Sequence, residues 1–256
     1  MKKNKNFKNK LIDNISGILL IDKPYGISSN RVLQIIKKIF NLNKIGHSGT
    51  LDILATGMLA LFLGKSTKFS KYIINSDKIY IVSIILGIRT DTYDYEGNVI
   101  KKKKIYLHEF EIKNALKIFN GTLNQIPPMF SSKKYKGYPL YKYARKGIKI
   151  LRNCKIIKIY YIKFLYFKFN KLILKICCSK GTYIRKFVDD LGLYLNCGAY
   201  VSELRRIKIS NFSYKKMFTI KDIKNLLKNK KKKYGHEIIL DKLIIPINNL
   251  FKKINK

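Results

Sequence analysis

The sequence predicts an α+β fold built on a central, mainly antiparallel mixed sheet that helices and loops flank. Apolar runs rich in β-branched and aromatic residues recur along the chain, and amphipathic helical segments interrupt them at irregular intervals. Such an irregular order favours a mixed sheet over a βαβ winding. The 256 residues are 46% hydrophobic and 12% aromatic, which is enough apolar material for a core.

The N-terminal region is expected to run from a basic tail into a strand and a helix. Residues 1–13 are polar and basic, whereas 17–22 (GILLID) form a short apolar strand. Residues 24–29 form a turn, and Ser28 or Ser29 can cap the helix that follows. Helical spacing relates the apolar residues Val32, Ile35, Ile36, Ile39 and Phe40. One face of this helix should therefore be buried.

A loop and two strands are expected next. Residues 44–56 (KIGHSGTLDILAT) contain two glycines and match neither a helical nor a strand period, so we expect a loop. A buried strand is expected at 58–63 and a second strand at 78–86. Between them, Ser66 can cap a short helix that reaches Ile74.

The rest of the chain combines polar turns with further strands and helices. Residues 89–97 (RTDTYDYEG) are turn-forming, and 124–147 have the composition of a long surface loop. The other expected elements are a helix at 109–119, two or three strands within 155–178, a helix from a Thr182 cap to about Leu195, a strand at 205–214, and a last helix that Thr219 and Asp222 open as a capping box.

The charge balance is strongly positive. Lysine and arginine number 54 against 15 aspartates and glutamates, which gives a formal net charge of +39. A surface of this sign attracts polyanions, so nucleic acid is the expected partner and an anionic membrane is the alternative. Codon usage in an AT-rich genome is a second explanation for the excess of lysine.

The sequence offers little support for membrane, metal or redox roles. No apolar stretch approaches the roughly 18 residues of a membrane span. The four cysteines lack CxxC spacing and only three histidines are present, so we expect reduced thiols, no metal and no cofactor. We expect a cytoplasmic protein.

Two segments carry groups that could do chemistry. Asp52 lies in the glycine-containing loop, five residues after His47, and loops carry many catalytic groups. An aspartate in a loop can equally be a turn or cap residue. In the second segment, 178–192 (CSKGTYIRKFVDDLG), a helix start presents Tyr183 and Arg185, which suits an anion. An ordinary capped helix with a surface arginine is the alternative.

Aromatic residues give two further candidates. Tyr80 lies in an expected strand, where packing is the usual role of a tyrosine. Residues 129–145 (MFSSKKYKGYPLYKYAR) interleave tyrosine with lysine and arginine, a pattern that suits RNA because bases stack on rings while cations hold the backbone. A solvated basic loop would have the same composition.

Five motifs in collinear order resemble one known family. They are IDKPYGISS, KIGHSGTLDILATGML, SDKIYIVSIILGIRTDTYDYEG, IPPMFSSKKYKGYPLYKYARKG and CSKGTYIRKFVDDLG. Together they resemble the bacterial tRNA pseudouridine-55 synthase family (TruB-type) over about residues 17–250. The resemblance implies the pseudouridine synthase fold and the isomerisation of a flipped-out T-loop uridine to pseudouridine.

The resemblance also implies a role for each matched residue. Asp52 matches the nucleophile, Arg185 the arginine that pairs with it, and Tyr80 the tyrosine that stacks on the base and is proposed to act in proton transfer. Substrate-binding roles are implied for Tyr80, His47, Tyr183, Leu204 and Lys23. The chemistry agrees, because the isomerisation needs a nucleophile, at either C6 of the base or C1′ of the ribose, and no metal or redox group.

The chain departs from the family pattern in two places. Ile53 stands where the family usually carries proline after the nucleophile, which could loosen the loop. The chain also ends where the catalytic domain normally does, so we expect a catalytic domain at 14–250, a basic stub at 251–256 and no C-terminal PUA domain. We expect a monomer acting on the T-stem and loop of tRNA. A tRNA-binding folding helper without catalysis and a ribosome-associated basic protein are the alternatives.

Overall fold

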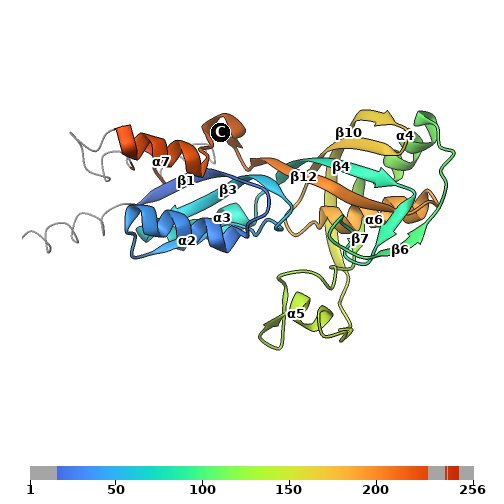
Figure 1. The fold of residues 1–256 in the computed structure, drawn as a ribbon, viewed down its shortest axis with the longest axis horizontal. Helices are drawn as coiled ribbons and strands as arrows, with labels where there is room; N and C mark the ends of the chain where they lie inside the picture. The colour runs from blue at the N-terminus through green and yellow to red at the C-terminus, as the bar shows by residue number, and fades with distance from the viewer. Residues whose placement is uncertain (1–15, 230–239, 241, 248–256) are drawn as a thin grey trace, which may run out of the picture. The chain divides into compact units, whose positions relative to one another are not determined.

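The chain folds into two compact units in a computed structural model that describes residues 16–229, 240 and 242–247 (Figure 1). Unit 1 contains the described residues up to Ser76 and those from Arg206 onward, and unit 2 is Asp77–Arg205. The region predicted as one catalytic domain, 14–250, therefore divides into two units. The predicted tail at 1–13 and stub at 251–256 lie outside the described residues.

The sheet of unit 1 has two fully buried strands at its centre. Strand β1 (Gly17–Lys23) pairs antiparallel with β3 (Thr56–Leu63), and every residue of β3 after Thr56 is buried. The short strand β2 (Ile45–His47) pairs with the last residues of β3. On the other side, β3 neighbours β12 (Ala199–Ile209), which itself pairs with β13 (Phe212–Ser213).

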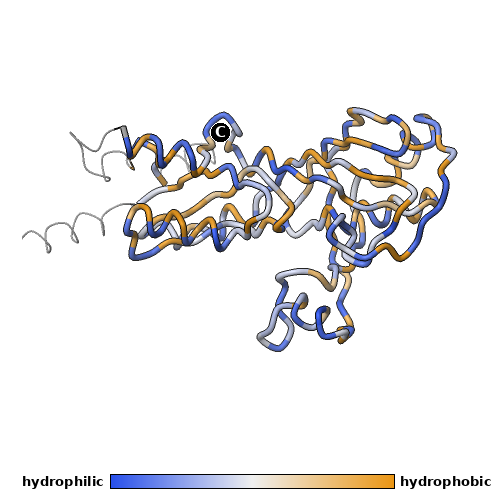
Figure 2. Tube along the Cα trace, viewed as in Figure 1, coloured by the Kyte–Doolittle hydropathy of each residue, from blue (hydrophilic) through white to orange (hydrophobic). Residues whose placement is uncertain are grey.

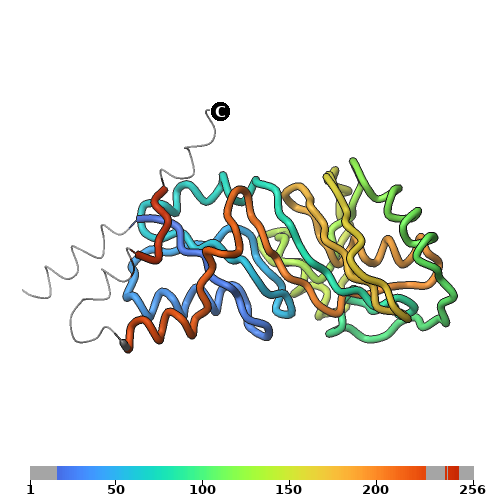
Figure 3. The backbone as a smooth tube through the Cα atoms, turned by 90° about the horizontal axis from the view of Figure 1, so that it is seen from above, coloured from blue at the N-terminus to red at the C-terminus, as the bar shows by residue number. Residues whose placement is uncertain are grey.

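Helices cover both faces of the unit 1 sheet, because its strands are apolar on both sides. Helices α2 (Ser29–Phe40) and α7 (Ile220–Asn229) pack on one face, and α3 (Ser70–Ile74) follows the 3₁₀ turn η1 (Gly64–Phe69) on the other (Figure 3). Hydrophilic and hydrophobic positions alternate along α2 in Figure 2, as expected for a helix that buries one face. The predicted strand at 17–22 and the helix after it are confirmed.

Two of the predicted helix caps of unit 1 are confirmed and a third is wrong. Ser28 caps α2, since its side chain accepts a hydrogen bond from the Arg31 amide at 3.1 Å. Thr219 and Asp222 exchange side chain–backbone hydrogen bonds of 2.9 and 3.0 Å, which is the predicted capping box of α7. Ser66 caps nothing, because its buried hydroxyl instead donates to the carbonyls of Gly17 and Leu63.

The sheet of unit 2 has the strand order β12-β4-β11-β10-β7, in which β11 pairs antiparallel with β4 and with β10, and β10 pairs antiparallel with β7. Its strands are β4 (Lys78–Leu86), β7 (Gly121–Gln125), β10 (Lys155–Lys168) and β11 (Lys171–Cys178). Alternate residues of β11 are buried and half-buried, so one face of this sheet lies toward the core. The predicted strands at 78–86 and within 155–178 are confirmed.

Helices and small hairpins complete unit 2. Helix α4 (Glu109–Ile118) and helix α6 (Ile184–Tyr194) contact each other through an edge-to-face pair, Phe119 against Phe187, with ring centroids 5.5 Å apart. The remaining elements are β5 (Ile88–Thr90), β6 (Val99–Lys102), β8 (Lys134–Tyr135), β9 (Tyr138–Pro139) and α5 (Leu140–Ala144).

Some sequence expectations need correction. The 44–56 loop contains β2, a strand too short to show a period, and the 124–147 loop contains β8, β9 and α5. Strand β12 starts at Ala199 instead of 205. Thr182 does not cap α6, since its hydroxyl donates to the Ser179 carbonyl at 2.9 Å.

In the portion of the chain that the structure describes, no helix has the length and apolarity needed to traverse a bilayer.

Candidate active site

Asp52 lies half-buried in the loop between β2 and β3, and the residue before it is fixed on both sides. The hydroxyl of Ser29 accepts from the Leu51 amide at 2.8 Å and donates to the Leu51 carbonyl at 3.0 Å. The Leu51 side chain is itself buried, and the Ala55 amide closes the turn onto the Asp52 carbonyl at 3.1 Å. The first turn of α2 therefore holds the backbone that carries the carboxylate.

Lys23 holds the residue on the other side of Asp52. Its ammonium is fully buried and donates to the backbone carbonyls of Pro24, Ile27 and Ile53 at 2.9, 2.6 and 3.1 Å. The Gly26 amide also donates to the Ile53 carbonyl, at 3.1 Å. A buried charge is tolerated only where polar partners surround it, and here the partners are turn and loop carbonyls. These contacts give Lys23 a role in shaping the Asp52 loop.

Arg206 braces both ends of the same loop, although no sequence motif marks it. Its guanidinium is 1% exposed and donates to the Met58 carbonyl at 2.8 Å and the Gly49 carbonyl at 3.1 Å. Gly57 has a φ of 96°, and a Cβ there would lie 2.3 Å from the Arg206 carbonyl. The glycine of the LATG motif is therefore needed for the close approach of β3 to β12.

His47 lies at the end of β2, near the braced loop. Burial, together with the positive charge of Arg206, lowers the pKa of His47 below its usual 6.5. Its Nδ1 atom is buried without a hydrogen-bond partner among the described residues. The imidazole is therefore neutral at pH 7.

In unit 2, Arg185 is held by a polar cluster at the start of α6. It is 5% exposed, and its Nη1 atom donates to the Asp94 carboxylate and the Thr92 carbonyl, each at 3.1 Å. Its Nη2 atom donates to the Phe130 carbonyl at 2.8 Å. Asp94 is 3% exposed and also accepts from the Glu96 amide at 3.2 Å. Asp94 is a second carboxylate at the site, and it lies inside the segment 89–97, for which the sequence predicts only a turn.

Tyr183, the residue before α6, is fixed through its backbone. The Gln125 side chain donates to the Tyr183 carbonyl at 3.0 Å and accepts from its amide at 2.8 Å. Tyr80 on β4 and Leu204 on β12 are buried, at 8% and 6% exposure. Gln125 is another positioning residue that the sequence did not reveal, because it acts across 58 residues.

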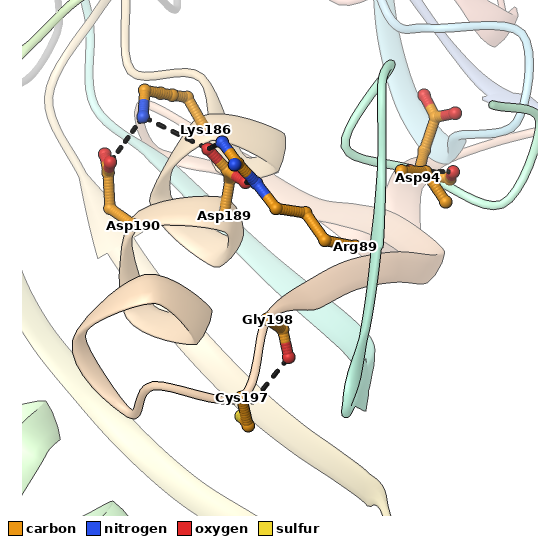
Figure 4. A network of polar contacts seen from close by, with 8 residues as sticks. Arg89, Asp94, Lys186, Asp189, Asp190, Cys197 and Gly198 are labelled. Carbon is orange, nitrogen blue, oxygen red and sulfur yellow. Dashed lines mark hydrogen bonds and ion pairs between the residues drawn. The ribbon is translucent and has the colours of Figure 1, made fainter. Parts of the chain in front are cut away.

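A second ion-pair network fixes α6 against β5, as Figure 4 shows. Arg89 donates from Nε and Nη2 to the two carboxylate oxygens of Asp189 at 2.6 and 3.1 Å, and Asp189 is fully buried. Lys186 donates to Asp189 at 3.2 Å and also to Asp190. The hydrogen bond to Asp189 raises the pKa of Arg89, and burial raises the pKa of Asp190. Tyr93 packs under both cations, 6.0 Å from Arg89 and 5.6 Å from Lys186.

The predicted aromatic–basic segment is partly ordered by its own side chains. Tyr135 and Tyr143 meet edge to face with centroids 6.0 Å apart. Lys136 lies 5.7 Å from the Tyr135 ring, and Arg145 lies 5.5 Å from the Tyr141 ring. Cations and rings are therefore presented together.

The candidate residues divide between the two units. Unit 1 holds Lys23, His47 and Asp52, and unit 2 holds Tyr80, Tyr183, Arg185 and Leu204. Contacts bring Lys23 to the Asp52 loop in unit 1. Within the described residues, no three His, Cys, Asp or Glu side chains are grouped as ligands for a metal ion. The four cysteines are free thiols, and burial raises the pKa of Cys178 to about 12.

Two family models match the chain. The model of the TruB family pseudouridylate synthase N-terminal domain matches residues 37–184, and that of the tRNA pseudouridylate synthase B C-terminal domain matches residues 185–252. A protein of Psychromonas ingrahamii named tRNA pseudouridine synthase B is 47% identical over 93% of this chain and 77% of its own length. One of the same name from Actinobacillus pleuropneumoniae is 44% identical over 94% and 78%.

Solved structures support the same relationship. A chain in the crystal structure of a Cbf5–Nop10–Gar1 complex superposes with a TM-score of 0.72 and 28% identity. A chain in the structure of an H/ACA RNP bound to a substrate RNA containing 2′-deoxyuridine gives 0.66 and 25%. The alignments cover 93% and 90% of the present chain but only 62% and 59% of the solved chains. The predicted fold class is confirmed.

Proposed function

Because the chain belongs to the TruB family of pseudouridylate synthases, we propose that it isomerises a uridine in the T-loop of tRNA to pseudouridine, with Asp52 as its nucleophile. The match of both family models carries the proposal. The clamped loop around Asp52 supports it, since a nucleophile must be held in one geometry to react efficiently.

The reaction changes which atom of the base is joined to the ribose. The bond between N1 and C1′ breaks, a bond between C5 and C1′ forms, and the proton on C5 is lost while N1 gains one. Asp52 would form the covalent intermediate that allows the detached base to turn, at either C6 or C1′. A base in a folded loop must first leave its stack.

The other candidate residues take supporting roles in this proposal. Arg185 orients the Asp52 carboxylate, and Asp94 in turn orients Arg185 through the 3.1 Å ion pair. Tyr80 stacks on the flipped base and takes part in proton transfer. His47, Tyr183 and Leu204 hold the base, whereas Lys23 acts by holding the loop. The enzyme would act as a cytoplasmic monomer without metal or cofactor.

The test is release of tritium from tRNA labelled at C5 of uridine. Asp52→Asn keeps the shape of the side chain but removes the anionic nucleophile, so turnover should disappear while tRNA affinity stays within a few-fold of wild type. Arg185→Lys should also be strongly impaired, because an ammonium cannot make the planar two-pronged contact. Multiple turnover by the Asn variant would remove Asp52 from the proposed role.

A further inference from the structure

One face of the unit 2 sheet carries tyrosine and lysine in alternation. The register of β10 on β11 pairs Tyr161 with Cys177, Lys163 with Lys175, Tyr166 with Ile173 and Lys168 with Lys171. The β11 partners are alternate residues, so their side chains and those of the paired β10 residues lie on one face. We call this the Tyr–Lys face and define it by Tyr161, Lys163, Tyr166, Lys168, Lys171 and Lys175.

The Tyr–Lys face is the open side of the sheet. The other face of β11 is fully buried at Leu172, Leu174 and Ile176, whereas the residues between them are only half-buried. Lys163 and Lys168 are exposed, and Tyr166 is 44% exposed. The face therefore presents its cations and rings to solvent.

The charges on this face oppose folding. Lys163 lies directly opposite Lys175, and Lys168 directly opposite Lys171. Like charges opposite each other across a strand pair are destabilising. Among the ion pairs of the described residues, only one involves these lysines: Lys171 to Glu203, at 3.9 Å between exposed side chains. An anion bound between the lysines would relieve the repulsion.

The spacing suits a nucleic-acid strand. The two lysine pairs are four residues apart along β11, about 13 Å at ~3.3 Å per residue. The Tyr166–Ile173 row lies between them, and Tyr161 lies beyond Lys163. Cations that hold phosphates and rings that stack on bases are the two parts of a single-strand binding surface. An acidic protein or an anionic membrane would use the lysines but has no bases to stack on the ring between the pairs.

We propose that the Tyr–Lys face binds a single-stranded segment of RNA. It lies on the opposite side of the sheet from Tyr80, which pairs in register with buried Ile176. The bound segment is therefore distinct from the one that presents the target uridine. This binding does not depend on the chemistry of Asp52.

The test uses a fluorescein-labelled 12-mer of uridylate and fluorescence anisotropy at low salt, with the full chain. Lys175→Glu places a negative charge directly opposite Lys163, so it should raise the urea midpoint of unfolding. It should also weaken oligouridylate binding about tenfold. Tyr166→Ala should weaken binding roughly tenfold, and Tyr166→Phe should not, because stacking needs only the ring. Lys224→Glu, on the exposed surface of α7, makes the same change in net charge and should weaken binding less than twofold.

The outcomes separate this proposal from its competitors. Equal losses from Lys175→Glu and Lys224→Glu would show that diffuse charge binds the RNA, and the proposal would fail. It would fail equally if Lys175→Glu lowered the urea midpoint, or if it abolished binding to phosphatidylserine vesicles while sparing oligouridylate. Tritium release from a T-arm hairpin is a separate readout, which these variants should leave unchanged and Asp52→Asn should abolish. A failure of one proposal is thus distinguishable from a failure of the other.

Discussion

At the scale of single residues, the loop of Asp52 depends on contacts from neighbours that sequence motifs do not mark as chemical. Ser29 and Lys23 each bind the backbone on one side of Asp52, and Arg206 binds the loop ends. The Ser29 contact is buried, and the side chains of Lys23 and Arg206 are almost fully covered, so water has little access to replace a lost partner. We therefore expect substitutions of these three residues to disturb the conformation of the Asp52 loop, although none of them lies in the GHSGTLD motif.

Ser29 offers a direct test, because Ser28 beside it is a matched control. Ser29→Ala leaves the buried amide and carbonyl of Leu51 unpaired, and should cost about 1–3 kcal/mol of stability. It should also lower kcat at least tenfold with little change in KM. Ser28→Ala removes only a helix cap, at about 1 kcal/mol, and should spare kcat. Urea unfolding and tritium release measure both; equal kcat values for the two variants would contradict the role of Ser29.

His47 predicts a dependence of stability on pH. Its pKa is lowered in the folded chain by burial and by Arg206, so the unfolded chain binds more protons just below pH 6.5. The contribution of neutral His47 to the free energy of unfolding should therefore be fully present above about pH 6.5, and it should decline as the pH falls toward the lowered pKa. His47→Gln should flatten this part of the profile in urea titrations from pH 5 to 8. An unchanged slope would show that other groups dominate.

At the scale of elements, two ion pairs of opposite polarity join α6 to the segment that begins with β5. Arg185 on α6 pairs with Asp94, and Asp189, one helical turn later, pairs with Arg89. Because donor and acceptor are exchanged between the two pairs, a shift of one turn would bring like charges together. The network therefore fixes the register of the helix that carries Arg185.

Removing one partner of the Arg89–Asp189 ion pair should strongly destabilise the fold. Asp189→Asn removes a fully buried carboxylate that pairs with both Arg89 and Lys186, and we expect a loss of about 3 kcal/mol in stability together with reduced kcat. Asp190→Asn, which loses only the contact with Lys186 at a partly exposed carboxylate, should change stability by less than about 1 kcal/mol. Chemical unfolding measures the loss of stability in each variant. Similar losses would show that the Arg89–Asp189 pair contributes no more than the Lys186–Asp190 contact.

Elements with local signals could be predicted from the sequence. Strand β1, helix α2 and the Thr219–Asp222 capping box were all predicted, because apolar period and cap chemistry act within a few residues. Strand β2 was missed because its only order comes from pairing with β3. Ser66 and Thr182 were wrongly predicted as caps. The sequence shows that a hydroxyl is present, but not whether it accepts from a helix amide or donates to a carbonyl elsewhere.

The candidate site follows the same division. Motif residues such as Asp52 could be selected from a resemblance, whereas Asp94, Gln125 and Arg206 could not, because each acts on a residue far away in sequence. Nothing in the run AYVSELRRIKI distinguishes Arg206 from Arg205 beside it, so its burial could not be predicted from the sequence.

At the scale of the whole molecule, the charge of +39 predicts steep salt dependence. On duplex nucleic acid, log affinity falls by about 0.9 per phosphate contact for each tenfold rise in salt, so six contacts would cost roughly a thousandfold between about 50 and 200 mM. The ratio of rates on intact and target-mutated T-loops should change far less, because base recognition does not release counter-ions. Salt titration of tRNA affinity measures this; a slope equal to one or two contacts would attribute the lysine excess to codon usage.

The buried ammonium of Lys23 has a consequence for protein chemistry. With three carbonyls around it and no exposed surface, this amine should react with acylating reagents far more slowly than the exposed lysines elsewhere in the chain. Its labelling rate then reports how often the Asp52 loop opens, and mass spectrometry of a lysine-labelled sample becomes a measure of site integrity that needs neither RNA nor turnover.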